Sequence, residues 1–153
     1  EGTANKNTAE YLKAQLEKNL PGMHVHIKIQ PLTQFIKLED AGQFDIALDS
    51  WGPDYPDPMS DLDMWVTGGH FNHIGYSNSE YDRLIQKAKH LGGQPAKRMK
   101  AMQKAEKILL EDAPIVPLYQ PAHAYLEKPY VKQFYVNRPG PNEDWTYTYI
   151  TNH

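Results

Sequence analysis

The chain has 153 residues, of which 40% are hydrophobic and 23% charged, the composition of one globular domain or of one lobe of a larger protein. The net charge of -3 argues against nucleic acid as a partner, and the absence of cysteine excludes disulfides, thiolate catalysis and cysteine-based zinc sites. The apolar runs are too short to span a membrane, and the polar opening Glu1–Asn7 suggests an excised piece of a longer protein.

The first third of the chain predicts alternating helices and strands. Capping residues and apolar spacing indicate the helices, and period-2 alternation indicates the strands. In order they are a helix from an N-cap at Asn7 to Asn19, a strand over Val25–Ile29, a helix over Leu32–Ala41 and a strand over Phe44–Leu48. This order and spacing predict a parallel, right-handed βαβ unit.

The second strand runs into an acidic loop within the stretch QFDIALDSWGPDYPDP, residues 43–58. Proline and glycine break any ladder after the strand, and ligands of open α/β sheets bind beyond the carboxyl ends of strands. Residues 43–82 hold eight acids and no Lys or Arg, which suits a cationic or amine-bearing ligand with a flat or apolar face. Asp57 before Pro58 is typical of a helix N-cap, whereas Asp54 has no such role.

The middle of the chain predicts three helices. A short one covers Pro58–Val66 and is followed by a turn at residues 67–70. A second begins in a capping box at residues 77–80 and ends at Gly92, with an apolar stripe of Tyr81, Leu84, Ile85, Ala88 and Leu91. A third runs from Pro95 to Pro114 with a stripe of Met99, Met102, Ala105 and Leu109.

The last part of the chain predicts short strands at Ile115–Tyr119, Tyr125–Leu126, Val131–Val136 and Trp145–Ile150. Together with the helices they predict an α/β fold, a mixed sheet flanked by helices. We expect a single domain over residues 1–153.

Seven basic residues lie between Lys87 and Lys107, against Glu106 alone. One interpretation is a solvated helical face. The other is a surface near anionic lipid or one that docks on a membrane partner.

Several motifs in one order resemble the C-terminal part of family 5 extracellular solute-binding proteins, the oligopeptide and dipeptide receptors of ABC importers. The motifs are DIALDSWGPDYPDP, HIGYSNSEYDRLI, an amphipathic helix, APIVPLY and KPYVKQFYV. The resemblance covers nearly the whole chain.

This resemblance implies one lobe of a two-lobed, type II periplasmic-binding-protein-like fold, without the partner lobe and without the strand that precedes the first helix. It implies capture of extracellular oligopeptides between two lobes, delivery to an ABC permease, a monomer and no catalysis or cofactor. It also implies a place in the periplasm or, lipid-anchored, on the outer face of the cell membrane.

The resemblance also implies a set of ligand-binding residues. The acid matching Asp54 pairs with the peptide's N-terminal ammonium, and the aromatic matching Trp51 walls a side-chain pocket. Backbone groups of this loop bind the peptide as another strand would. The expected contacts are Asp49, Ser50, Trp51, Gly52, Pro53, Asp54, Tyr55 and, in the cleft lining, Asn72.

The sequence departs from this pattern just before Trp51. The best-known oligopeptide receptor has a basic residue there for the carboxylate of short peptides, but this chain has Leu48, Asp49 and Ser50. Longer peptides, or carboxylate capture by the missing lobe, fit this segment better.

Two alternatives stay open. The same fold binds other solutes in relatives, including nickel complexes, haem, sugars and signalling peptides. A metal-dependent hydrolase would use His70 and His73 with Asp61 or Asp63, because imidazole and carboxylate are common zinc ligands.

Overall fold

A computed structural model of the chain describes residues 3–122, 124–136 and 143–152. They form two compact units, Glu1–Ser50 and Trp51–His153. Each unit has its own internal packing.

The first unit contains the helices α1, Thr3–Asn19, and α2, Leu32–Asp40. Helix α1 begins before Asn7, so the predicted N-cap there is wrong: the residues from Thr3 onward include no Gly or Pro that would stop a helix. On α1, Lys13 Nζ donates to the carbonyl of Val25, and Glu17 Oε1 accepts from the Val25 amide at 2.9 Å. These bonds tie the segment after α1 to the helix.

The two strands predicted in this unit do not form. No residue of Val25–Ile29 or Phe44–Leu48 is in a strand, so the predicted βαβ unit is wrong in these residues. Their apolar side chains are open, with Ile29 58% and Ile46 72% exposed. Period-2 alternation marks a chain suited to a sheet, but a ladder also needs neighbouring strands to pair with.

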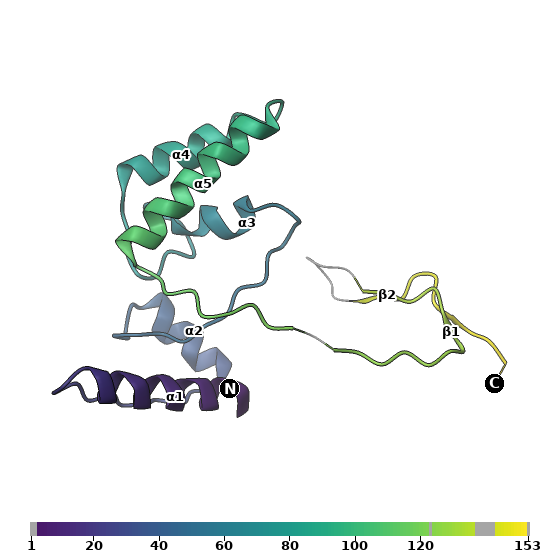
Figure 1. The fold of residues 1–153 in the computed structure, drawn as a ribbon, viewed down its shortest axis with the longest axis horizontal. Helices are drawn as coiled ribbons and strands as arrows, with labels where there is room; N and C mark the ends of the chain where they lie inside the picture. Colours follow the sequence, from purple (N-terminus) through teal and green to yellow (C-terminus); the bar gives the residue numbers. More distant parts are fainter. Residues whose placement is uncertain (1–2, 123, 137–142, 153) are drawn as a thin grey trace. The chain divides into compact units, whose positions relative to one another are not determined.

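The second unit has its core between three helical segments, drawn in blue and green tones in Figure 1. These are α3, Met59–Leu62, with the 3₁₀ turn η1, Asp63–Trp65; α4, Ser79–Lys89; and α5, Pro95–Asp112. The fully or nearly buried side chains come from all three helices: Met59, Leu62, Tyr81, Leu84, Ile85, Ala88, Ala101, Met102, Ala105 and Leu109. The predicted stripes of α4 and α5 are therefore confirmed at most positions.

Two details of these helices differ from the prediction. The N-cap of α4 is Asn78, one residue into the predicted box, because its Oδ1 accepts from the Glu80 and Tyr81 amides at 3.0 and 3.1 Å. Met99, predicted in the buried stripe of α5, is 41% exposed, whereas Ala101, not predicted there, is buried. Helix α5 ends in a left-handed cap at Ala113, one residue before Pro114.

The strands of the second unit are short and antiparallel. Strand β1, Val131–Lys132, pairs with β4, Tyr149–Ile150, and β2, Tyr135–Val136, pairs with β3, Glu143–Asp144. The predicted strand Val131–Val136 is split, since Gln133 between its halves has a φ of 55° that no ladder accommodates. The predicted strands Ile115–Tyr119 and Tyr125–Leu126 are absent.

Candidate ligand-binding site

The loop Trp51–Asp57 is attached to α3 through one buried residue. Ser60 is 3% exposed and takes two bonds from the loop. Its carbonyl accepts from Trp51 Nε1 at 3.2 Å, and its Oγ accepts from the Asp54 amide at 2.9 Å. The loop backbone is thereby fixed, while the Asp54 carboxylate is left free to point elsewhere.

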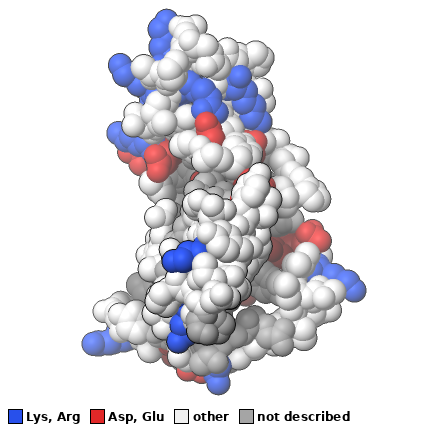
Figure 2. Space-filling model, turned by 90° about the vertical axis from the view of Figure 1, so that its right-hand side faces the viewer, with Lys and Arg blue, Asp and Glu red and all other residues white. Residues whose placement is uncertain are grey.

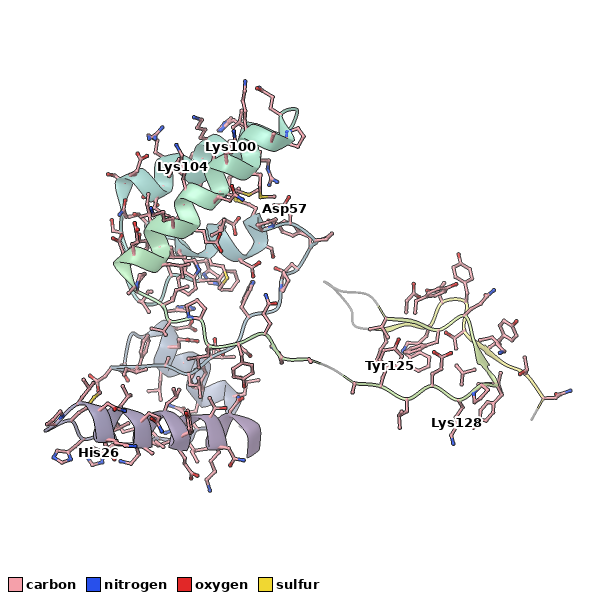
Figure 3. The ribbon with its side chains drawn as sticks, in the orientation of Figure 1. His26, Asp57, Lys100, Lys104, Tyr125 and Lys128 are labelled. Atoms are coloured by element: carbon pink, nitrogen blue, oxygen red, sulfur yellow. The ribbon has the colours of Figure 1, made fainter. Side chains whose placement is uncertain are left out.

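Asp57, at the end of the loop, has a structural role. Its Oδ1 accepts from the Met59 amide, the first of α3, at 2.9 Å, but the N-cap position is Pro58, so the predicted N-cap at Asp57 is one residue early. Arg98 of α5 also donates a hydrogen bond to each carboxylate oxygen, with Nη1–Oδ2 at 2.5 Å and Nη2–Oδ1 at 2.8 Å. The hydrogen bonds with Arg98 lower the pKa of Asp57, and the same bonds raise the pKa of Arg98. Figure 3 labels Asp57 beside α3.

Asp54 differs from Asp57 in having no such partner. Its side chain is exposed, and its carboxylate makes no hydrogen bond or ion pair with any residue that the structure describes. Tyr55 beside it is 43% exposed, and partial burial raises the pKa of its hydroxyl. Within the loop, the Asp54 carboxylate is therefore the one without a partner among the described residues, and its binding of a cation stays a prediction.

Two exposed aromatic rings lie against each other near this loop, one of them three residues before Asp54 in the chain. The rings of Trp51 and Phe71 lie 5.1 Å apart at 58°, and both remain open, 39% and 43% exposed. His70 packs edge-on against Phe71, at 4.9 Å between ring centres. Open aromatic faces held in place by neighbours offer apolar contact at low entropic cost.

Asn72 holds the turn that carries Phe71. Its Nδ2 donates to the carbonyls of Val66 at 2.9 Å and Tyr76 at 2.7 Å, and its Oδ1 accepts from the Tyr76 amide at 3.0 Å. The amide is thus engaged within the turn. Ligand contact by Asn72 stays a prediction.

The remaining predicted site residues lie in or next to the loop. Gly52 is exposed and Pro53 half-buried. Asp49 and Ser50 are exposed and are the last residues of the first unit. No measured contact tests their contribution to binding.

Three residues that shape the loop were missed by the sequence analysis: Ser60, Phe71 and Arg98. Arg98 lies 41 positions after Asp57, so no local spacing relates the two. Phe71 carried the best signal, an aromatic on a Gly-rich turn shortly after the loop.

The hydrolase alternative requires a cluster of metal ligands. Across residues 3–122, 124–136 and 143–152, no three His, Cys, Asp or Glu side chains come together in a way that could hold a metal ion. Among the same residues, no helix is both long and apolar enough to cross a bilayer.

Comparison with known sequences shows relatives along nearly the whole chain. Residues 1–73 match the family described as bacterial extracellular solute-binding proteins, family 5 middle. The dipeptide-binding protein DppE of Bacillus subtilis is 34% identical over 128 residues, which are 84% of this chain and 23% of DppE. The periplasmic murein peptide-binding protein MppA of Escherichia coli is 35% identical over 90% of this chain and 25% of its own length. The chain thus spans about a quarter of the length of these relatives.

Comparison with solved structures also finds peptide-binding proteins with a similar fold. The substrate-binding domain of an oligopeptide ABC transporter from Bacillus anthracis matches with a TM-score of 0.85 and 41% identity, over 96% of this chain and 29% of that one. The chain therefore has part of the lobed α/β fold of the peptide-binding proteins, as predicted. The chain is thus similar to the family 5 extracellular solute-binding proteins: residues 1–73 match the family, and the similarity to peptide-binding members continues through nearly all of the chain.

Proposed function

We propose that this chain is part of the substrate-binding component of an ABC importer for oligopeptides, and that it forms most of the C-terminal lobe. The peptide binds along residues 49–55, with its N-terminal ammonium on the Asp54 carboxylate. Trp51 and Phe71 wall the pocket for a side chain, and the exposed backbone of Gly52 and Pro53 lies along the peptide.

The observation that carries this proposal is the contrast within one loop between a paired and an unpaired carboxylate. Asp57 is held by Arg98, whereas Asp54 has no partner among the described residues, although its amide is bonded to Ser60. A rigid backbone with a free charge is preorganised for a ligand cation. The ammonium fixes the register, because a misplaced peptide leaves the carboxylate unpaired when water is excluded.

The wider assignment follows from what the similar proteins are. Relatives carry the names of dipeptide-binding and periplasmic peptide-binding proteins. For this protein we infer a non-catalytic monomer outside the cytoplasm, periplasmic or lipid-anchored on the outer face, that hands peptides to a membrane permease. Closure of two lobes on the peptide would be the signal that the permease reads.

Mass spectrometry of ligands that co-purify with the intact protein tests the proposal. The protein is isolated without denaturation, its bound molecules are released by acid, and the released mixture is sequenced. We expect peptides with free N-termini and varied side chains. A single non-peptide solute in stoichiometric amount would overturn the assignment of substrate.

A further inference from the structure

The basic side chains of α4 and α5 are not used by the proposed binding loop, apart from Arg98. Three others have carboxylate neighbours: Arg83 is paired with Glu80, Lys89 Nζ lies 3.4 Å from Asp63 Oδ2, and Lys107 Nζ lies 3.5 Å from Glu111 Oε1. Four lysines make no ion pair with any residue in the described part of the chain: Lys87, Lys97, Lys100 and Lys104. We call these four the lysine face.

The lysine face is one continuous surface. Lys97, Lys100 and Lys104 follow one another at helical spacing on α5, and all are exposed, while Ala101 and Ala105, each one residue after a lysine, are buried on the other side. Lys87 of α4 joins them, because its charge and that of Lys104 both lower the pKa of one carboxylate, Glu80. Figure 3 labels Lys100 and Lys104 along α5, and Figure 2 shows Lys and Arg gathered at the top of the view.

Glu80, the acid whose pKa Lys104 and Lys87 lower, does not neutralise this surface. Glu80 is already bound by Arg83, with Nε–Oε2 at 2.7 Å and Nη2–Oε1 at 2.6 Å. The pair is exposed and contributes no net charge to the face. Glu106 is the one acid within residues 87–107, so the four lysines still present a net positive potential to solvent.

The composition of the face indicates the kind of partner. Protein–protein interfaces are enriched in Tyr, Trp and Arg and depleted of Lys. Within α4 and α5 the single aromatic residue, Tyr81, is fully buried, and Arg83 and Arg98 are both committed to carboxylates. Lysine ammoniums on flexible stems act as point charges, which suit a diffuse layer of phosphates better than a shaped protein pocket.

We propose that the lysine face binds the anionic headgroups of a phospholipid bilayer and holds the protein with α4 and α5 toward the membrane. A cluster of four to eight basic residues is the usual size for such binding, and each contributes about fivefold in affinity near an anionic surface. This binding is independent of the peptide site.

Vesicle co-sedimentation of the intact protein tests this. The probes are vesicles of equal parts phosphatidylglycerol and phosphatidylcholine, and vesicles of pure phosphatidylcholine, at low and at high salt. We expect the protein to sediment only with the anionic vesicles. We expect high salt to abolish this binding, because screening weakens the attraction between the exposed lysines and the lipid phosphates. The triple variant K97E/K100E/K104E is expected to bind them about a hundredfold more weakly.

A matched variant separates position from net charge. K18E/K28E/K37E changes the same total charge at exposed lysines of the first unit and is expected to stay within about fivefold of wild type. Unchanged circular dichroism and peptide affinity show that the variants fold. Equal losses in both triple variants, equal binding to neutral vesicles, or binding of the wild type to polyglutamate but not to anionic vesicles would each overturn the proposal, the last in favour of an acidic protein partner.

Discussion

The helical core and the loop Trp51–Tyr55 lie in one unit but differ in how far their side chains are buried and paired. In the core, Tyr81, Ile85 and Met102 are under 2% exposed, and no buried side-chain polar atom of the described residues lacks a partner. The loop keeps the Trp51 ring open and the Asp54 carboxylate unpaired, although Ser60 fixes its backbone. The difference indicates that the core stabilises the unit, while the loop keeps exposed groups that, in our proposal, a ligand engages.

The largest effect on stability is expected in the core. Ile85→Ala removes a fully buried side chain between α4 and α5 and leaves a cavity, so the free energy of unfolding should fall by about 3 kcal/mol. Urea denaturation followed by circular dichroism measures it. Peptide affinity of the folded fraction should not change; a large loss of affinity at full folding would mean that core and loop are not separable.

The opposite pattern is expected for Trp51→Ala. Its ring is 39% exposed beside Phe71, so its loss should weaken peptide binding by about 2–3 kcal/mol, as for other aromatic anchors. The loss of its bond to Ser60 should lower stability by only about 1 kcal/mol. Calorimetry with a co-purified peptide gives the affinity. Trp145→Ala, at an indole 60% exposed after β3, is the control and should bind normally. Equal affinity of wild type and Trp51→Ala would make the ring a packing element only.

Asp57→Asn changes a loop residue but should affect stability, and by less than Ile85→Ala. It keeps an acceptor for the Met59 amide but breaks the charged bonds with Arg98, so stability at neutral pH should fall by about 1.5–2 kcal/mol. The pKa of Asp57 is lowered in the folded state from an ordinary value of 3.8. Its contribution is therefore complete above pH ~4 and is lost as the pH falls through the lowered pKa. Stability measured against pH should show the two proteins converging in acid; a constant gap would contradict the ion pair.

The helices were predictable because their signals are local. Asp57-Pro58, Pro95 and the apolar stripes of α4 and α5 lie within a few residues of the structure that they specify. The same holds for Asp54, whose lack of a capping role could be read from its neighbours.

The strands, and the residues that contact the loop from elsewhere in the chain, were not predictable in this way. A strand requires a partner elsewhere, and Val116, 74% exposed, sits in an alternating segment that has none here. Arg98 on Asp57 and Phe71 on Trp51 depend on how distant segments fold together. Such pairings follow from tertiary packing between segments that are distant in the sequence, which one sequence does not reveal.

The most direct test of the binding loop uses the charge of the peptide as well as that of the protein. Wild type and Asp54→Asn are titrated with one peptide in two forms, with a free N-terminus and with an acetylated one, and Asp45→Asn, an exposed acid outside the loop, is the control. We predict that Asp54→Asn binds the free-amine peptide at least about tenfold more weakly and the acetylated one nearly as well as wild type, because only the ammonium leaves a charge without its partner. If acetylation costs the wild type nothing, or if both peptides lose equally in the variant, Asp54 does not bind the ammonium.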